Sequence, residues 1–432
     1  MINVIFDATI LLNWRETGSV RSGSFFVAQN IYERFKKNPE VNLFLYFDLK
    51  NINSFLMNAI VFPEPVVNDF DNLFWKIFWE INKRMRFYHK KWYNHVLLRK
   101  PFALGILLSQ NFLQRNKMVK QPIVSQCQVF FSPLFSIPQV IKKQKNLLFF
   151  TMLYDTIPFW MPEDCGEEWT NELKKIVNNV DERDYFICDS FNSFLDFNKI
   201  NPKISSDNTS VALLAADDKF CEGKEDSLPD DLMQKYNLPK GKRYAFCLSS
   251  VSPRKNFKKM AESFLIFVKK NNVQDMIFIV CGSGSEEFIH KIQNEHPYEK
   301  ELIDSTFFPT GYVRDDEKVL LYQHAEWFVY TSQYEGFGLP PLEAMQCGCP
   351  VITSNNSSLP EVVGDAGIMI DWDSEEQHIE AYEKYYFDKE LKKENSRRGL
   401  DRAKLFSWEK CADCITESMM EKITSRNQKN DF

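Results

Sequence analysis

The sequence predicts two doubly wound α/β domains that face each other across a cleft, and three observations support this. The chain has 432 residues, which is more than one hydrophobic core usually supports. Short, β-rich apolar runs alternate with amphipathic helical stretches, as is typical of parallel sheets covered by helices. A polar segment rich in turn formers, at 221–240, separates two such halves and marks a domain boundary.

The first half, residues 1–220, is predicted to form one domain. Its opening residues have no cationic region followed by a long apolar stretch, so we expect a buried first strand and no signal peptide. A helix is expected from about 24 to 37. The apolar runs predict strands at 3–10, 42–47, 129–131, 146–152, 185–188 and 209–214.

The second half, residues 241–400, shows the same alternation more regularly. Strands are predicted at 243–249, 276–281, 306–309, 327–331, 351–353 and 368–371. Helices are predicted at 258–270, 315–325, 341–346 and 359–363. Residues 401–432 are expected to form a C-terminal helix that packs back onto the first domain. Doubly wound sheets bind ligands at the carboxyl ends of their strands, so the site is expected there.

The formal net charge of −6 conceals an uneven distribution. Residues 71–120 hold eleven Lys and Arg but only two acids, a local charge of +9. A chain that is acidic elsewhere lacks the basic footprint of a nucleic-acid-binding protein. The basic residues therefore point to another kind of partner.

Within this basic region, residues 72–93 carry apolar side chains at helical spacing and three tryptophans, Trp75, Trp79 and Trp92. Basic residues lie largely off the apolar stripe. A cationic amphipathic helix with interfacial tryptophans is typical of anionic membrane surfaces. We expect peripheral attachment to the inner face of the membrane through about 72–120. Two alternatives remain: the stripe packs against the first domain, or the cations bind a polyanionic acceptor.

Cysteines and acidic tripeptides give no indication of a metal. The pairs at 347 and 349 and at 411 and 414 have no neighbouring ligand pair, so we expect reduced thiols in a cytoplasmic protein. Asp-x-Asp tripeptides at 69–71 and 371–373 arise readily among 59 acidic residues. No metal site is predicted. No apolar run approaches the ~20 residues that span a bilayer.

Two glutamates bracket a glycine-rich loop between a predicted strand and helix. Glu335 lies on the turn and Glu343 about one turn into the helix, while Gly336 and Gly338 let the backbone approach a ligand. The free N–H groups at the start of the helix form an anion site, and a carboxylate at position 343 can accept the hydroxyls of a ribose. Alternatively, the glycines only turn the chain and the glutamates only cap the helix.

This loop resembles the Glu-x7-Glu motif of retaining glycosyltransferase family 4, the glycosyl transferases group 1, whose members have the GT-B fold of two Rossmann-like domains. Other segments resemble family motifs in the same order, over about 243–385: 247–256, 278–284, 310–313 and 356–364. The run Pro-Arg-Lys-Asn within 247–256 is similar to that of one subset of the family. The first half matches more weakly.

The resemblance implies a role for each residue of these motifs. Arg254 and Lys255 would neutralise a diphosphate leaving group, a role that their position in a strand-to-helix loop also favours. The family often has another cation after the strand, where this chain has Ser249, so phosphate binding would depend mainly on Arg254 and Lys255. The other implied contacts are Glu335 with Gly336, Phe337, Gly338 and Leu339 for the donor sugar, Glu343 for the ribose, and Tyr312 and Val313 for the base.

Three loops of the first half are also candidates. Gly18 lies in a loop after the first strand that resembles the family's first loop and can approach a phosphate or an acceptor. Tyr154 and Asp155 resemble a His-Asp pair with tyrosine in place of histidine. Asp155 is predicted to be catalytic, although a turn aspartate explains it equally well. Asp189 and Ser190 resemble a later family loop or, equally, a helix N-cap.

The sequence thus predicts a retaining glycosyltransferase. It would move a sugar from a nucleotide diphosphate sugar to a hydroxyl of a lipid-linked or cell-surface glycan precursor, of polysaccharide, O-antigen or capsule type. We expect no cofactor, no metal, and no side-chain nucleophile, because a leaving phosphate oxygen would take the proton. An alternative, motivated by Ser249 and Tyr154, is a catalytically silent GT-B subunit of a membrane-surface glycosylation complex. A nicotinamide dehydrogenase is disfavoured because Gly-x-Gly-x-x-Gly is absent.

Overall fold

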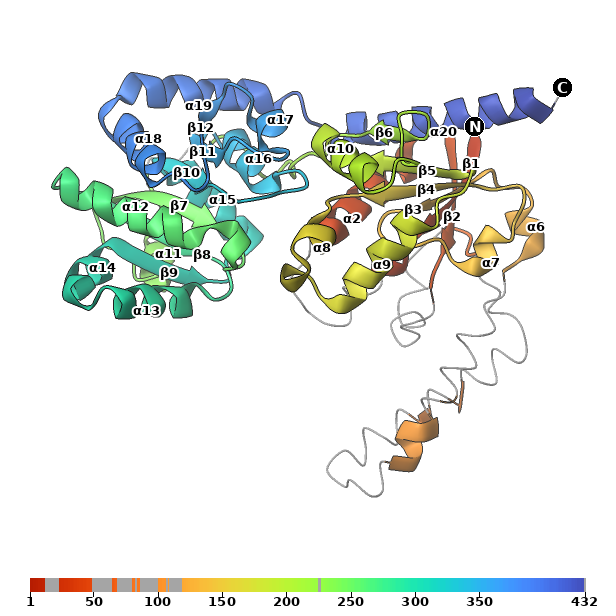
Figure 1. Ribbon diagram of the computed structural model, residues 1–432, viewed down its shortest axis with the longest axis horizontal. Coiled ribbons are helices and arrows are strands. Elements are labelled where there is room, and N and C mark those ends of the chain that lie inside the picture. The colour runs from red at the N-terminus through yellow and green to blue at the C-terminus, as the bar shows by residue number, and fades with distance from the viewer. Residues whose placement is uncertain are drawn as a thin grey trace.

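The computed structural model describes residues 1–11, 23–48, 64–67, 119–223 and 227–430, with short pieces at 80–81, 84–85, 100–105 and 108. In this part of the chain, two six-stranded sheets form two domains that lie side by side (Figure 1). Gly18 and most of the basic aromatic segment 72–93 lie outside the described residues.

The first sheet has the strand order β2-β1-β3-β4-β5-β6, and all neighbouring strands are parallel. Its strands are rich in phenylalanine and mostly buried, because helices cover both faces. The strands are β1 (Ile2–Asp7), β2 (Val41–Tyr46), β3 (Val129–Ser132), β4 (Leu148–Leu153), β5 (Asp184–Cys188) and β6 (Thr209–Val211).

The helices of the first domain differ in length. Three of them are long enough to form amphipathic faces, namely α2 (Gly23–Lys37), α9 (Glu167–Asn178) and α10 (Phe191–Ile200). The shorter ones are α6 (Gln121–Val124), α7 (Gln139–Lys142), α8 (Ile157–Trp160) and the 3-10 turn η3 (Pro162–Asp164). Both α8 and α10 begin directly after the carboxyl ends of strands, β4 and β5, which face the second domain.

The second sheet has the order β12-β11-β10-β7-β8-β9 and is again parallel. The central strand β7 (Arg243–Leu248) and its neighbour β10 (Trp327–Tyr330) mark the point where the strand order reverses. Ligands bind at such a point in doubly wound sheets. The other strands are β8 (Met276–Cys281), β9 (Phe307–Gly311), β11 (Val351–Ser354) and β12 (Gly367–Ile370).

Helices and 3-10 turns surround this second sheet. They are α11 (Asp230–Lys235), η4 (Pro253–Lys255), α12 (Phe257–Lys270), α13 (Ser285–Glu295), η5 (Pro297–Glu299), α14 (Lys300–Thr306), α15 (Asp315–His324), α16 (Leu339–Gln346), α17 (Leu359–Val363), α18 (Glu375–Phe387) and α19 (Lys389–Ala403). The turn η4 and helix α16 follow β7 and β10, the two strands at the reversal point, and therefore flank the expected site.

The last helix, α20 (Trp408–Asn430), leaves the second domain and runs along the first (Figure 1). The Trp408 and Phe26 rings pack edge to face with centroids 5.5 Å apart. The Ser418 hydroxyl bonds to Ser210 of β6 at 2.9 Å. The chain thus crosses between the domains twice, once after β6 and once before α20.

Most predicted strands lie within two residues of the observed ones, and the largest differences occur at strand ends. The run 209–214 contributes only Thr209–Val211 to the sheet. Leu214, Ala215 and Ala216 are nevertheless buried, because they join a hydrophobic cluster that contains residues of both domains. The predicted strand was too long because apolar residues buried at the domain junction continue its apolar run. Among the described helices, none is both long and apolar enough to cross a membrane.

Candidate functional site

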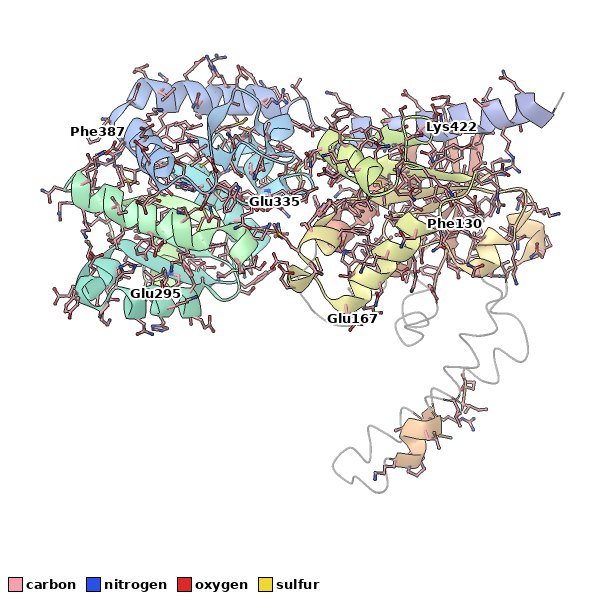
Figure 2. The ribbon with its side chains drawn as sticks, in the orientation of Figure 1. Phe130, Glu167, Glu295, Glu335, Phe387 and Lys422 are labelled. Atoms are coloured by element: carbon pink, nitrogen blue, oxygen red, sulfur yellow. The ribbon has the colours of Figure 1, made fainter. Side chains whose placement is uncertain are left out.

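A cavity of about 600 Å³ lies between the two domains, at the carboxyl ends of both sheets. The first domain contributes side chains from α2, from the ends of β4 and β5, and from α9. The second domain contributes the ends of β7 and β10, the start of α16, and α15. Figure 2 shows Glu335 on the side of the second domain that faces the first.

Glu335 forms ion pairs with two basic side chains at the wall of this cavity. Its Oε1 accepts hydrogen bonds from Lys255 Nζ at 2.6 Å, from the Tyr330 hydroxyl at 3.0 Å and from Arg254 Nη1 at 3.2 Å. The glutamate is 8% exposed. Charged hydrogen bonds of this kind compensate for burying the three ionised groups. The cluster holds the ammonium group of Lys255 at the cavity wall.

Asn256 explains how the chain presents these cations. The turn η4 ends at Asn256, which adopts the left-handed conformation with φ 60°. Its side-chain amide donates to Thr331 O at 3.0 Å and to Trp372 O at 2.6 Å, which ties the loop to β10 and β12. Asparagine tolerates positive φ better than most residues. The Pro-Arg-Lys-Asn run therefore encodes a turn that orients Lys255.

The buried charges shift one another's pKa values. Burial alone would raise the pKa of Glu335, but Lys255 and Arg254 outweigh it and hold this pKa below its usual range. Burial lowers the pKa of Lys255, and the opposite charge of Glu335 only partly restores it. Across the cavity, burial raises the pKa of Asp155 to about 6. These shifts favour the ionised form of Glu335, whereas the pKa of Asp155 lies at about 6.

Gly336 allows the two domains to touch. A Cβ atom at this position would lie 2.4 Å from the carbonyl oxygen of Tyr154 and 3.0 Å from Cβ of Asp155. A side chain cannot fit without moving one domain. Gly338 precedes α16 with φ 114°, a conformation that favours glycine. The loop between these glycines therefore brings the N-terminus of α16 to the cavity wall, where its N–H groups favour an anion.

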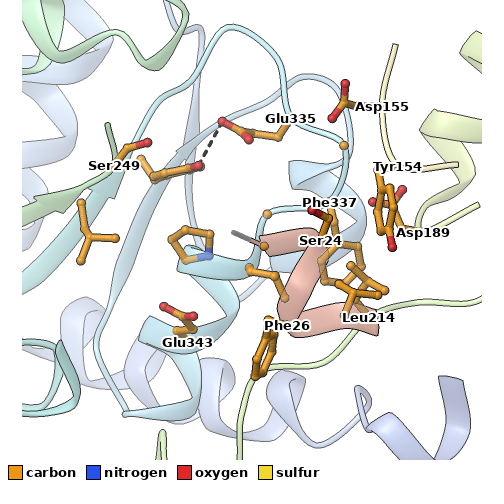
Figure 3. Close-up of a pocket in the computed structure, with 18 of the residues that line it drawn as sticks. Ser24, Phe26, Tyr154, Asp155, Asp189, Leu214, Ser249, Glu335, Phe337 and Glu343 are labelled. Carbon is orange, nitrogen blue, oxygen red and sulfur yellow. Dashed lines mark hydrogen bonds between the residues drawn. The ribbon is translucent and has the colours of Figure 1, made fainter. Parts of the chain in front are cut away.

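Glu343 lies on α16 and lines a different part of the cavity (Figure 3). The Tyr322 hydroxyl donates to its Oε2 at 3.2 Å. Burial raises its pKa, while the positive charge of Lys318 opposes the rise. Two lysines stand nearby: Lys219 and Lys318 each bind Asp315 at 2.9 Å. The part of the cavity near Glu343 is therefore lined by paired charges.

Helix α10 joins the domains at the edge of the cavity. Glu361 of α17 accepts hydrogen bonds from the backbone N–H groups of Phe191 at 2.8 Å and Asn192 at 2.7 Å. The Ser190 hydroxyl donates to Gly336 O at 2.7 Å. A carboxylate at a helix N-terminus satisfies free N–H groups and the helix dipole. This carboxylate comes from the other domain, so the cap is also an interdomain contact.

Most of the predicted residues meet in the cavity. Its lining includes Glu335, Gly336, Phe337, Gly338, Leu339, Glu343, Ser249, Lys255 and Asp155. Arg254 is not part of the lining: it contacts Glu335 and bridges to Asp164 of the first domain at 3.1 Å. Tyr312 is 56% exposed and Val313 is buried, and neither lines the cavity. The predicted donor-binding Gly18 lies outside the described residues.

Sequence reasoning missed several lining residues. Lys219 and Lys318 come from the interdomain connection and from α15, and Trp169 comes from α9. No motif marks them, because each belongs to a polar or amphipathic stretch of ordinary composition. Tyr330 had a clearer signal, since it ends the strand that directly precedes Glu335. Asp189, which the sequence leaves open between a family loop and an N-cap, lines the cavity, whereas Ser190 is the residue that caps α10.

The arrangement suits an anionic ligand with hydroxyl groups. Cations at Lys255 and Arg254, together with the N-terminus of α16, can stabilise a diphosphate. Within the described residues, the one group of three side chains spaced to share a cation is Glu262, Glu295 and His296, which does not line the cavity. Lys258 already pairs with both of these glutamates.

Similarity to a known protein family lies in the second half of the chain. Residues 230–402 match the family model described as Glycosyl transferases group 1. The Escherichia coli protein described as O-antigen chain mannosyltransferase B is 35% identical over 180 residues, 42% of this chain and 46% of the relative. The Escherichia coli serotype-specific mannosyltransferase WbdA is 28% identical over 197 residues, 46% of this chain and 24% of the relative. The match thus spans less than half the length of these relatives.

The architecture also has solved counterparts. The crystal structure of Anabaena HepE in complex with UDP and glucose has a TM-score of 0.62 with this chain, at 13% identity, over 98% of this chain and 100% of the other. At that identity the likeness concerns the fold. The two facing Rossmann-like domains predicted from the sequence are therefore confirmed, and the chain has the GT-B fold, with a second domain whose residues 230–402 match the Glycosyl transferases group 1.

Proposed function

We propose that the protein is a retaining glycosyltransferase of family 4, in the subset that carries Pro-Arg-Lys-Asn. It transfers a hexose from a nucleotide diphosphate sugar to a hydroxyl group of a glycan precursor. The match of 230–402 to the Glycosyl transferases group 1 supports this reading. Both Escherichia coli relatives are described as mannosyltransferases, and the name of one of them, O-antigen chain mannosyltransferase B, supports a glycan precursor of O-antigen type as acceptor.

One observation carries the proposal: Glu335 is held by Lys255 and Arg254 beside the glycine loop that starts α16, and Glu343 lies eight residues further in the same cavity. The diphosphate of the donor would bind between Lys255 and the N-terminus of α16. Glu335 would accept hydroxyl groups of the donor sugar, and Glu343 those of the ribose. The acceptor would enter from the first domain, along α2 and α9.

These residues support a mechanism without a side-chain nucleophile. The acceptor hydroxyl would attack the anomeric carbon from the face that the diphosphate leaves, so that the configuration is retained. The departing phosphate oxygen would take the hydroxyl proton. Lys255 and Arg254 would stabilise the negative charge that develops on the diphosphate. We expect this reaction to proceed with a chelator present, because the cations are supplied by side chains.

The site of action is proposed from the sequence of residues 72–120. Cationic and aromatic residues there would hold the enzyme on the inner, anionic face of the membrane, where lipid-linked glycan precursors are available. Binding to anionic vesicles that weakens as salt rises would support this attachment. If the same amount of protein sediments with and without vesicles at every salt concentration, this attachment is contradicted.

Transfer by site variants tests the proposal. A panel of UDP-glucose, UDP-N-acetylglucosamine and GDP-mannose is screened for thermal stabilisation, because a donor that binds the native state raises its stability. With the donor found, Glu335→Ala is expected to lower transfer by at least about 100-fold. Lys255→Ala is expected to weaken donor binding by about tenfold or more.

Matched controls come from an ion pair on the surface of the same domain. Lys270 and Glu383 pair at 2.8 Å and do not line the cavity. Lys270→Ala and Glu383→Ala are expected to transfer like the wild type. Undiminished transfer by Glu335→Ala and Lys255→Ala together would overturn the assignment. Donor binding without any release of nucleotide diphosphate would instead indicate a catalytically silent subunit.

A further inference from the structure

Asp189 is a buried carboxyl group that the proposed mechanism does not use. It follows β5 directly, lines the cavity from the first domain and is 2% exposed. Figure 3 shows it beside Tyr154, on the side of the cavity opposite Glu343. Strands β4 and β5 pair with Leu153 opposite Cys188. Asp155 and Asp189 therefore emerge at the same edge of the sheet, one strand apart.

The carboxyl group of Asp189 has one oxygen, Oδ1, that no side chain or backbone group satisfies in the part of the chain that the structure describes. Its Oδ1 is buried and has no hydrogen-bond partner among the described residues, and no described lysine or arginine forms an ion pair with this aspartate. An unsatisfied buried acceptor costs about 1–3 kcal/mol, and native proteins rarely retain one without a reason. Because the residue faces a cavity, a bound ligand can supply the missing partner.

The two hydroxyl groups nearest in the sequence each donate to a backbone carbonyl group, and neither makes a hydrogen bond to Oδ1 of Asp189 in the described structure. The hydroxyl of Ser190 donates to Gly336 O at 2.7 Å, and that of Ser193 donates to Tyr154 O at 2.6 Å. Asp155 accepts from the backbone N–H of Ile157 at 2.9 Å. Each of these contacts fixes the loops around Asp189 while leaving its own oxygen without a donor.

The chemistry of the missing partner is that of a neutral hydroxyl group. Burial raises the pKa of Asp189 well above its ordinary range; the nearby Ser193 hydroxyl opposes this rise, and the negative charge of Asp155 adds to it. A neutral carboxyl group both accepts and donates a hydrogen bond, as a hydroxyl group does. An anionic group such as a phosphate would be repelled by Asp155 and is better placed at Lys255, across the cavity.

We propose that Asp189 is a specificity-determining residue, which forms a hydrogen bond with a hydroxyl group of a sugar bound in the cavity. This inference rests on the proposed glycosyl transfer and adds a residue that selects the sugar. The hydroxyl belongs either to the donor sugar or to the acceptor sugar. Both present the same chemistry, and the experiment separates them.

Deoxy sugars test the proposal directly. In the first arm, the donor that supports transfer is compared with its 2-, 3-, 4- and 6-deoxy analogues. In the second arm, methyl α-mannopyranoside is the acceptor probe and is compared with its monodeoxy analogues. The wild type is expected to discriminate against one analogue by about 10- to 100-fold in kcat/KM, because a deoxy analogue leaves a buried polar group without its partner. Asp189→Ala is expected to reduce that ratio to about one.

Three further variants separate recognition from folding. Asp189→Ser is also too short to reach the sugar and should behave like Asp189→Ala. Asp189→Asn keeps the length and hydrogen-bonding capacity and should restore most of the discrimination. The control is Asp184→Asn: Asp184 lies at the other end of β5, binds Lys142 at 2.8 Å and should leave discrimination unchanged. Because Oδ1 of Asp189 has no hydrogen-bond partner among the described residues, removing the carboxyl group should not lower the melting temperature.

Each outcome decides the question. If Asp189→Ala loses the discrimination between the donor and its deoxy analogue, the hydroxyl belongs to the donor sugar. If it loses the discrimination between the acceptor probe and its deoxy analogue, the hydroxyl belongs to the acceptor sugar. Wild-type ratios in both arms for Asp189→Ala and Asp189→Ser would overturn the proposal while leaving glycosyl transfer intact. Absence of transfer by the wild type with every donor would instead count against the proposed function.

Discussion

At the residue scale, the site depends on an asparagine that carries no charge. The sequence drew attention to Arg254 and Lys255 because cations suggest phosphate binding. The structure shows that Asn256 holds the turn that presents them, through its positive φ and its bonds to Thr331 and Trp372. The Pro-Arg-Lys-Asn run therefore combines ligand-binding residues with the residue that orients them.

Replacement of Asn256 by alanine should therefore affect both stability and donor binding. The variant loses two side-chain hydrogen bonds. It also places alanine, which tolerates positive φ less well than asparagine, in the left-handed region. We expect a loss of about 2–4 kcal/mol in the free energy of unfolding and a higher donor Kd. Urea unfolding and calorimetric titration of the donor measure the two effects.

Asn272→Ala is the matched control for this variant. Asn272 also has a positive φ, 49°, but it is exposed and does not line the cavity. Its replacement by alanine causes the same kind of backbone strain as Asn256→Ala. Unlike Asn256→Ala, it breaks no hydrogen bond to the segments that follow β10 and β12. It should cost about 1 kcal/mol and leave donor binding unchanged. Equal losses for both variants would show that strain alone explains the effect at Asn256.

The residues that could be predicted from sequence are those whose chemistry is local. Glu335, Glu343 and the glycines between them share one loop, so their spacing alone places them together. Lys219 and Lys318 are 99 positions apart and meet at Asp315 only because the interdomain connection passes α15. No pattern in one sequence records such a contact. Asp189 shows the same limit, since its neighbours come from separate strands.

At the scale of elements, α10 and α17 form a cap that joins the domains. The N-terminus of α10 has free backbone N–H groups, like that of every helix. The Ser190 hydroxyl accepts a hydrogen bond from the backbone N–H of Ser193 within the first domain. Glu361 of the second domain accepts from the backbone N–H groups of the two residues that follow Ser190. Part of the helix cap is thus available only when the domains are together. Closure of the cavity and stability of α10 are linked.

Glu361→Ala tests this link. Loss of the carboxylate leaves two N–H groups of α10 without their partner and removes a charge from the helix N-terminus, so closure becomes less favourable by about 1–2 kcal/mol. We expect a larger radius of gyration in small-angle scattering and a donor KM raised by about 5- to 30-fold, with little change in melting temperature.

The control for this variant is Glu376→Ala, in the exposed first turn of α18, which makes no interdomain contact. It should leave both the radius of gyration and KM at wild-type values. If Glu361→Ala also retains the wild-type radius and KM, the cap does not contribute to closure. Closure would then depend on the other interdomain contacts, such as Ser190 with Gly336 and Arg254 with Asp164.

Strands were easier to predict than the elements that connect the domains. Buried parallel strands are short apolar runs, and most of those predicted agree with the structure. Helix α9 was not predicted, although it supplies Trp169 to the cavity. The α18–α19 pair was also missed, since Lys389–Ala403 is strongly charged and only a few of its residues are buried. Its packing partners lie outside its own sequence.

At the scale of the whole molecule, the two domains share one hydrophobic cluster and the C-terminal helix. The cluster includes Phe6 and Phe131 of the first sheet together with Phe246 and Phe328 of the second. Helix α20 belongs to the same cluster through Trp408, which is 2% exposed. The chain thus returns to the domain where it began. The packing of α20 against the first domain also affects the cavity, because Phe26 contacts Trp408 and lines the cavity.

Trp408→Ala should therefore weaken the fold and the acceptor side of the cavity together. Removing a buried tryptophan costs about 3–5 kcal/mol in a well-packed site. Phe26 then loses its edge-to-face partner, so α2 is held less firmly, and we expect the KM for the acceptor to rise more than the KM for the donor. Chemical unfolding gives the first quantity, and steady-state kinetics give the second. The neighbouring Glu409→Ala is the control: Glu409 pairs with Arg34 at 2.9 Å but its side chain is 66% exposed, so its loss should cost less than about 1 kcal/mol. Wild-type stability in Trp408→Ala would show that α20 only lies on the first domain, whereas lower stability with unchanged kinetics would confine its role to folding.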